Sequence, residues 1–258
     1  ELADVAAGRL AYHELGSGEP LILHHGAESH KGQYSLFAPL LADGIRSVSY
    51  DQRDMVDSFA AGDPYSMSDL ADDCVQLMDA LEIEKAHIMG ISFGGAVALH
   101  VAINHPDRVQ TLVVGAAPPT FAVRPALMDR VVAAPPEERA EIMALALVSD
   151  RAQQDPEMMA DVRRLVTGTF SRPGSHRGAV PATHDVTDQL GLITAPTLLV
   201  FGEKDELVPV ENGNALHEAI SGSQLVVIPE ARHGLSFEFA EQTAALISDF
   251  VLAHPVPA

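Results

Sequence analysis

The chain has 258 residues, of which 47% are hydrophobic, and a formal net charge of −20 from 16 Lys and Arg against 36 Asp and Glu. This length and composition predict one large globular domain, or one domain with an insertion, and exclude a disordered chain. The negative charge repels phosphate backbones and anionic lipids, so no nucleic-acid partner and no membrane partner are expected. No apolar run reaches the length of about 20 residues that a membrane span needs. A single cysteine, Cys74, excludes an internal disulfide, and we expect a cytoplasmic protein whose oligomeric state is open, a homodimer included.

Short apolar runs alternate with helical patterns in the first half of the chain. Strands are expected at residues 20–24, 46–50, 85–89 and 109–115, and helices at residues 68–81, with Ser68 as N-cap, and 92–105. Short buried strands that alternate with helices favour a parallel sheet covered on both faces. The predicted fold class is α/β, with a mostly parallel central sheet flanked by helices.

This alternation breaks between Pro118 and about Leu190. The stretch contains paired prolines, a Gly/Pro loop at residues 172–178 and helical patterns at residues 137–148 and 157–166. The alternation then resumes, with strands at residues 197–201 and 224–228 and helices at residues 210–220 and 237–253. We therefore predict a core formed by residues 1–117 and 191–258, and a helical cap inserted at residues 118–190, which we call the cap segment.

The pentapeptide Gly90-Ile-Ser92-Phe-Gly94 lies between a predicted strand and a predicted helix. This context is typical of a nucleophile elbow, a tight turn that holds a serine in a strained backbone conformation. The glycines two residues on either side are needed because a Cβ there would collide with the turn. The alternative is a Gly-rich turn that serves close packing, but such a turn does not require serine at its tip.

A serine nucleophile needs a histidine base and an acid that orients the base. Among the 12 histidines, His233 follows the last predicted strand, so it lies at the carboxyl edge of the sheet, where Ser92 also lies. Asp205 follows the preceding strand at the same edge, although it could also be an N-cap or surface acid, and Glu203 and Glu206 compete with it. The chain order Ser92, Asp205, His233 is that of the α/β-hydrolase triad.

The chain resembles the α/β-hydrolases, their serine esterase and lactonase branch in particular, over nearly its full length. The resemblance is carried by six motifs: His25-Gly26, Asp51-Gln-Arg53, Gly-Ile-Ser92-Phe-Gly-Gly95, Pro106-Asp-Arg-Val109, Gly202-Glu-Lys-Asp205 and Arg232-His-Gly234. It implies that Ser92 is the nucleophile, Asp205 the orienting acid and His233 the base. It also implies an oxyanion hole formed by the backbone N–H groups of Ala27 and Phe93, which would stabilise the developing charge.

One loop departs from the family pattern. Where most relatives read Gly-x-Gly-x-Ser after Asp-x-Arg, this chain reads Asp54-Met-Val-Asp-Ser58. Because a β-branched residue such as Val56 disfavours positive φ, we expect this loop to differ in shape.

The expected reaction is hydrolysis of a small, largely apolar carboxylic ester or lactone. The alternatives are a carbon–carbon bond hydrolase of a ring-cleavage product and a triad-bearing ligand receptor with little turnover, since fold alone does not decide function. Three methionines of the cap segment, Met128, Met143 and Met158, are candidates for lining the substrate pocket, although ordinary helix packing explains them as well. No cofactor is expected, and no metal at His24, His25 and His30, because adjacent strand residues point to opposite faces.

Overall fold

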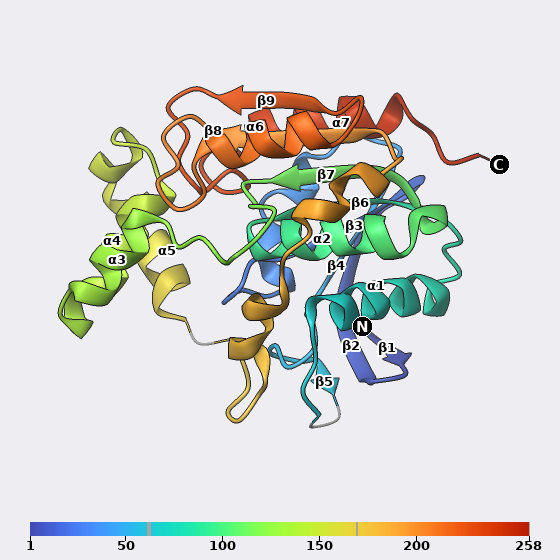
Figure 1. Ribbon diagram of the computed structural model, residues 1–258, viewed down its shortest axis with the longest axis horizontal. Helices are drawn as coiled ribbons and strands as arrows, with labels where there is room; N and C mark the ends of the chain where they lie inside the picture. The colour runs from blue at the N-terminus through green and yellow to red at the C-terminus, as the bar shows by residue number, and fades with distance from the viewer. Residues whose placement is uncertain (61–62, 169, 258) are drawn as a thin grey trace.

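One mixed sheet organises the fold in the computed structural model, which describes residues 1–60, 63–168 and 170–257 (Figure 1). Its strands are β1 (Leu2–Val5), β2 (Gly8–Gly16), β3 (Glu19–His24), β4 (Ile45–Tyr50), β5 (Phe59–Ala60), β6 (Ala86–Ile91), β7 (Val109–Gly115), β8 (Thr197–Gly202) and β9 (Gln224–Ile228). Within the described residues the strand order is β1-β2-β4-β3-β6-β7-β8-β9, and β5 pairs with β2.

The strands from β4 to β9 in this order pair in parallel, whereas β2 pairs antiparallel with β1, β4 and β5. The predicted mostly parallel α/β sheet is therefore confirmed. The sequence predicts no strand before residue 20, because β2 buries only Leu10 and Ala11 and lacks the period-two alternation of a half-buried strand.

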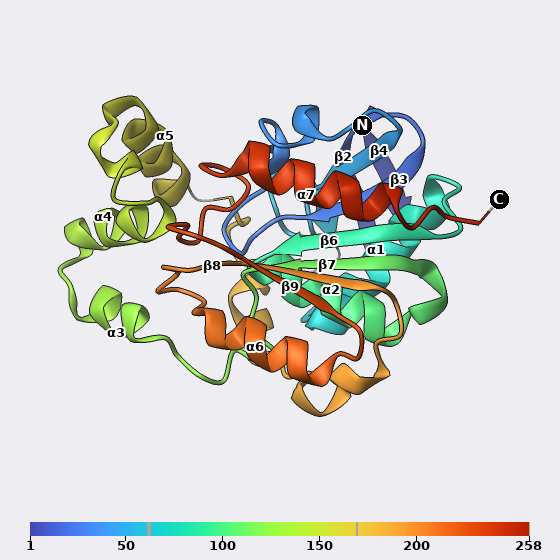
Figure 2. The ribbon, with the colours of Figure 1, turned by 90° about the horizontal axis from the view of Figure 1, so that it is seen from above.

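Helices cover both faces of the sheet (Figure 2). They are α1 (Met67–Ala80), α2 (Phe93–Asn104), α3 (Ala126–Ala133), α4 (Pro136–Leu147), α5 (Pro156–Thr167), α6 (Val210–Ala219) and α7 (Ala240–Leu252). Helices α1, α2 and α6 pack on one face in the larger hydrophobic core, and α7 packs on the other. Within the described residues, no helix is long and apolar enough to cross a membrane.

The N-cap of α1 is Ser66 rather than the predicted Ser68. The Ser66 side chain accepts a hydrogen bond from the backbone N–H of Asp69, and the Asp69 carboxylate accepts one from the Ser66 N–H, which completes a capping box. Ser66 and Ser68 both precede the apolar pattern of the helix. Ser66 is the N-cap because Asp69, three residues later, supplies the carboxylate that completes the capping box.

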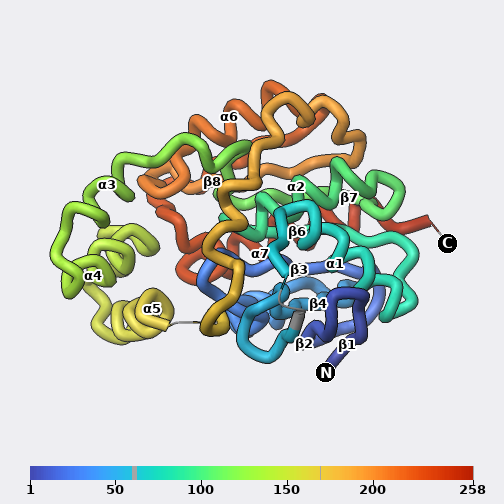
Figure 3. Tube along the Cα trace, turned by 60° about the horizontal axis from the view of Figure 1, so that its bottom comes forward, coloured from blue at the N-terminus to red at the C-terminus, as the bar shows by residue number. Residues whose placement is uncertain are grey.

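The cap segment divides into two parts that pack differently. Helices α3, α4 and α5 lie together at one end of the molecule and bury small apolar clusters of their own (Figures 1 and 2). The stretch after α5 runs back along the core towards β8 (Figure 3), with short 3₁₀ helices at Arg177–Thr183 and Thr187–Leu192. Val180, Val186 and Leu190 of this stretch belong to the larger core. The end of the cap segment is thus built into the core, because its apolar side chains fill space beside α1, α2 and α6.

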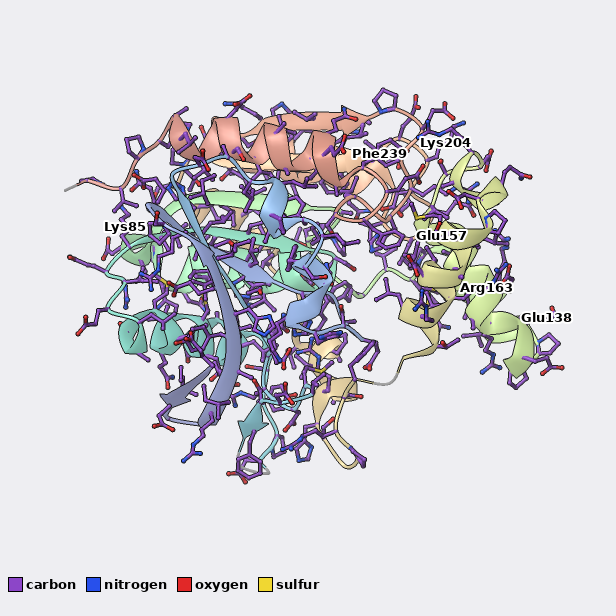
Figure 4. The ribbon with its side chains drawn as sticks, turned by 180° about the vertical axis from the view of Figure 1, so that it is seen from behind. Lys85, Glu138, Glu157, Arg163, Lys204 and Phe239 are labelled. Carbon is purple, nitrogen blue, oxygen red and sulfur yellow. The ribbon has the colours of Figure 1, made fainter. Side chains whose placement is uncertain are left out.

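Helices α3 to α5 lie at the carboxyl edge of the parallel strands. Figure 4 shows Lys204, which follows β8, at the same end of the molecule as Glu138, Glu157 and Arg163 of α4 and α5. Lys85, which precedes β6, lies at the opposite end. Ligands of open parallel sheets bind at the carboxyl edge, so the cap segment stands where a substrate would enter.

Two buried histidines join the cap segment to α2. His184 Nε2 donates to the carbonyl of Pro118 at 2.9 Å, which leaves Nδ1 as the acceptor for His100 Nε2 at 3.2 Å. His100 Nδ1 in turn faces the Ser68 hydroxyl at 3.5 Å. Burial, followed by the neighbouring His184, lowers the pKa of His100 to about 4, and burial also lowers the pKa of His184. Both rings are therefore neutral in the folded protein at pH 7.

We expect the free energy of unfolding to fall as the pH is lowered from about 6.5 towards 4. In this window the unfolded chain binds a proton at His100 that the folded chain does not, so acid favours unfolding. The contribution of His100 at pH 5 is on the order of 2 kcal/mol. Urea unfolding at pH 7 and pH 5 measures it: His100→Gln should reduce the difference between the two pH values, and His13→Gln, at an exposed histidine, should not. An equal pH dependence in wild type and His100→Gln would contradict the assignment.

Candidate active site

Ser92 stands at the tip of the turn between β6 and α2, with φ 59° and ψ −125°. This is the strained conformation that the elbow predicts. A Cβ on Gly90 would lie 2.0 Å from the carbonyl oxygen of Gly94, and a Cβ on Gly94 would lie 2.0 Å from that of His24. The reason given from the sequence for both glycines is therefore confirmed: the turn packs so closely on itself and on β3 that no side chain fits.

Backbone hydrogen bonds hold the elbow. The Ser92 N–H donates to the carbonyl of Gly115 at 2.8 Å, and the Ser92 carbonyl accepts from the N–H of Ala96 at 3.1 Å. The Ser92 residue is half-buried, and its hydroxyl makes no hydrogen bond to any residue that the structure describes. The hydroxyl is thus presented at the carboxyl edge rather than used to cap α2.

Asp205 and His233 form a buried pair at the same edge of the sheet. His233 Nδ1 and Asp205 Oδ2 are 2.7 Å apart, and both side chains are almost wholly buried. Asp205 Oδ1 accepts the N–H groups of Leu207 and Val208, each at 2.8 Å, so the loop fixes the carboxylate. Because this carboxylate accepts hydrogen bonds, Nδ1 of His233 carries the proton and Nε2 has the free lone pair. Such a pair can act chemically as an oriented base.

Two glycines allow the loops that carry this pair to meet. A Cβ on Gly202, at the end of β8, would lie 2.5 Å from the carbonyl oxygens of Ala231 and Arg232. A Cβ on Gly234 would lie 2.5 Å from the carbonyl oxygen of Leu147, to which the Gly234 N–H donates at 2.8 Å. The loop that carries His233 is therefore clamped between the loop after β8 and the end of α4.

The competing acids lie elsewhere. Glu206 pairs with Arg130 at 2.9 Å and is half-exposed, and Glu203 accepts a hydrogen bond from the Glu230 N–H. The structure also pairs other histidines away from Ser92: His87 with Thr111 and Glu19, His105 with Asp72, and His217 with Ser223. Within the described residues, no three His, Cys, Asp or Glu side chains group as metal ligands.

The two N–H groups that the resemblance assigns to an oxyanion hole come from neighbouring segments. Phe93 opens α2, and Ala27 follows β3, which passes against the elbow at Gly94. In the described part of the chain neither N–H donates a hydrogen bond. Gln52 holds the loop after β3 through its backbone N–H to His25 Nε2 at 3.1 Å and its side chain to the His25 carbonyl at 2.9 Å.

The three methionines proposed for the pocket lie in different surroundings. Met158 packs in the apolar cluster between α4 and α5, as ordinary helix packing predicts. Met143 and Leu207, which lies two residues after Asp205, both pack against the small cluster that contains Leu127, and Met128 is half-buried on α3. Of the three, Met143 is the one that borders the same apolar cluster as the loop of the acid.

The reason given for a different shape of the loop at residues 54–58 does not hold, because Val56 takes a positive φ despite its branched Cβ. Val56 has φ 35° and Asp54 has φ 65°. Hydrogen bonds to the end of the cap segment hold this conformation: the Val56 N–H donates to the carbonyl of Phe170 at 3.0 Å, and the Arg172 N–H to that of Asp54 at 2.8 Å. These tertiary contacts override the preference of a β-branched residue.

Sequence reasoning missed Arg177, which lies beside the predicted oxyanion hole. Its Nη2 donates to the Ala27 carbonyl at 3.3 Å, and its guanidinium carbon lies 3.9 Å from the centre of the Phe93 ring. The residue is only 3% exposed. An arginine in a Gly/Pro loop looks like a surface charge, so no signal in the sequence identifies it.

A serine at a strained strand–helix turn, with a buried acid–base pair at the same sheet edge, defines the α/β-hydrolase class of proteins. The chain belongs to the alpha/beta hydrolase fold family, whose family model matches residues 19–240.

Three similar proteins show the range of this family. A 2-hydroxymuconate semialdehyde hydrolase from a Pseudomonas species is 31% identical, over 96% of this chain and 92% of that protein. The structure of a thermophilic esterase from Thermogutta terrifontis has a TM-score of 0.84 at 26% identity and covers 99% of both chains. That of a meta-cleavage product hydrolase from Pseudomonas fluorescens has a TM-score of 0.80 at 25% identity, covering 98% of this chain and 97% of the other. Hydrolysis is common to all three, and the bond that is hydrolysed is not.

Proposed function

We propose that the protein is a serine hydrolase of small carboxylic esters or lactones. The observation that carries the proposal is the strained turn at Ser92 together with the 2.7 Å contact between His233 Nδ1 and Asp205 Oδ2. The likeness to an esterase structure over 99% of both chains supports it.

In the proposed mechanism, Ser92 Oγ attacks the carbonyl carbon while His233 Nε2 takes the hydroxyl proton. The N–H groups of Ala27 and Phe93 donate hydrogen bonds to the carbonyl oxygen and stabilise the negative charge that develops on it. When the C–O bond to the leaving group breaks, His233 gives the proton to the departing oxygen and an acyl-enzyme remains. Water, deprotonated by His233, then attacks the acyl carbon, and Ser92 leaves with the proton. Asp205 stabilises the imidazolium in both halves.

A second candidate is a hydrolase of a ring-cleavage product, in which the same groups break a carbon–carbon bond. It is favoured by the relative named 2-hydroxymuconate semialdehyde hydrolase and by the similar structure of a meta-cleavage product hydrolase. The sequence between β3 and the elbow reads Ala27-Glu-Ser-His30, and Ile91 precedes Ser92. This differs from the Gly-rich loop and Gly-Asn-Ser that we associate with such hydrolases, so the ester or lactone remains first.

Steady-state rates on a panel of p-nitrophenyl esters, lactones and a meta-cleavage product test the proposal. We expect many turnovers on esters or lactones, and kcat/KM values there that exceed the value for the meta-cleavage product. The reverse order would favour the second candidate. A single turnover on every compound would indicate a ligand receptor.

A further inference from the structure

Arg177 is a buried cation that forms no salt bridge with any residue that the structure describes. A guanidinium has five N–H donors, and a single one of them, on Nη2, reaches a carbonyl, that of Ala27. Nε and Nη1 are buried and have no hydrogen-bond partner. Tyr65 and the exposed Glu28 lie near the guanidinium, but no described carboxylate forms a salt bridge with it. Burying a charge without a salt bridge is unfavourable, so an anion that pairs with the guanidinium is expected to bind there.

Arg53 is a largely buried arginine of the same protein whose guanidinium has a carboxylate partner. Its Nε and Nη2 donate to the two oxygens of Asp73, each at 2.6 Å, in a bidentate pair. Arg177 has no such carboxylate, although the chain has 36 Asp and Glu residues. The difference indicates that the partner of Arg177 is supplied from outside the chain.

The surroundings of Arg177 place its guanidinium beside the proposed oxyanion hole. Its guanidinium contacts Ala27 and Phe93, whose N–H groups form the proposed oxyanion hole. His25 is fully buried nearby, and burial, with Arg177 as a second cause, lowers its pKa well below the usual value. His25 is thus neutral and adds no charge, positive or negative. Burial lowers the pKa of Arg177 to about 10, so the guanidinium remains charged at neutral pH.

We propose that Arg177 binds a carboxylate carried by the substrate, so that the protein acts on esters or lactones of short dicarboxylic or other acid-bearing compounds. The carboxylate pairs with the free N–H groups of Arg177 while the scissile carbonyl lies in the oxyanion hole beside it. Arg177 begins the 3₁₀ helix Arg177–Thr183. Because Val180 of this helix packs in the larger core, the position of Arg177 is fixed relative to the core. This inference deepens the proposed function and rests on it.

Matched substrates isolate the contribution of the carboxylate. The mono-p-nitrophenyl ester of glutaric acid and p-nitrophenyl pentanoate have the same chain length and differ in a terminal carboxylate or methyl group. We expect wild type to favour the glutarate ester in kcat/KM, and Arg177→Met to lower that value roughly 10- to 100-fold, the range of hydrogen bonds to charged groups. The kcat/KM value for the pentanoate ester should fall by a clearly smaller factor, because a neutral chain makes no ionic contact with Arg177.

Two further variants keep the experiment decisive. Arg177→Lys retains the charge without the planar fork and should fall between wild type and Arg177→Met on the glutarate ester. Arg172→Met removes an exposed arginine of the same loop and should change neither substrate. Melting temperatures show which variants are folded. Equal losses on both substrates in folded Arg177→Lys or Arg177→Met, or a wild type that favours pentanoate, would overturn the proposal.

Titration of glutarate into Ser92→Ala protein, followed by calorimetry, separates this inference from the proposed function. We expect binding that the additional change Arg177→Lys weakens at least tenfold. If no ester or lactone is turned over but this binding is found, the proposed reaction fails and the carboxylate site stands. If glutarate binds equally with and without Arg177, or does not bind, the proposed carboxylate site is wrong.

Glu28, which is exposed on the loop beside Arg177, is the competing partner within the chain. If Glu28→Gln creates glutarate binding that wild type lacks, the guanidinium is paired with Glu28 and the proposal is overturned.

Discussion

Replacement of Ser92 by alanine is expected to lower kcat for ester hydrolysis by about 10⁵- to 10⁶-fold, as the loss of a triad nucleophile does in other serine hydrolases. The serine sits at φ 59° in a turn whose shape is set by Gly90 and Gly94, and its hydroxyl makes no hydrogen bond to any described residue. Alanine therefore leaves the turn and the fold in place and removes the nucleophile alone. The measurement is kcat on p-nitrophenyl butyrate, with the melting temperature as the check on folding.

Ser221→Ala is the matched control, since this exposed serine lies before β9 at the opposite edge of the sheet. It should keep the wild-type rate. A Ser92→Ala protein that retains more than about a thousandth of the wild-type rate would show that another group attacks the ester.

Asp205→Asn is expected to lower kcat by about 10⁴-fold, the size of effect that the same change has in a serine protease triad. The two amide N–H groups at Oδ1 hold the amide oxygen of asparagine in that position. Its NH₂ group then faces His233 Nδ1 and donates to it. The histidine must take the other tautomer, with its proton on Nε2, and Nε2 no longer accepts the proton of Ser92.

Glu206→Gln, one residue along the same loop, controls for the loss of a negative charge near the site. Glu206 points to Arg130 and Arg232 at the surface, so its removal should leave kcat within about threefold of wild type. Similar losses from Asp205→Asn and Glu206→Gln would mean that the loop contributes through its charge, and the assignment of Asp205 as orienting acid would be abandoned.

The elbow and the acid–base pair could be predicted because their chemistry and their backbone requirements both leave traces in the sequence. Gly90, Gly94 and Ser92 are spaced as the turn requires, and the structure shows the collisions that exclude a larger residue at either glycine. Asp205 and His233 follow successive strands, and parallel strands bring such positions to one edge. The parallel part of the sheet could also be predicted, because its strands are short apolar segments that alternate with helices in the sequence.

Features that depend on contacts between distant segments could not be predicted. Val56 takes a positive φ because Phe170, more than a hundred residues later, accepts its N–H. Arg177 is buried because its loop folds back beneath Ala27 and Phe93, and a single arginine carries no period or spacing that reveals this. Local preference describes such residues poorly, since the free energy that places them comes from partners far away in the chain.

The pairing of β7 with β8 across residues 116–196 has a consequence for how the protein folds. Bringing the ends of so long a connection together costs about 4 kcal/mol of chain entropy, which the contacts between β7 and β8 must offset. Contacts between strands so far apart in the sequence also form slowly. The pairing of β3, β4, β6 and β7 and the hydrogen bond from Ser92 to Gly115 use no residue beyond β7, whereas Asp205 and His233 arrive when β8 and β9 dock. In a refolding experiment, backbone protection of β3, β6 and β7 should therefore precede the recovery of ester turnover. On a ribosome, the nucleophile would leave the exit tunnel and fold against its strand well before the chain that activates it has been synthesised.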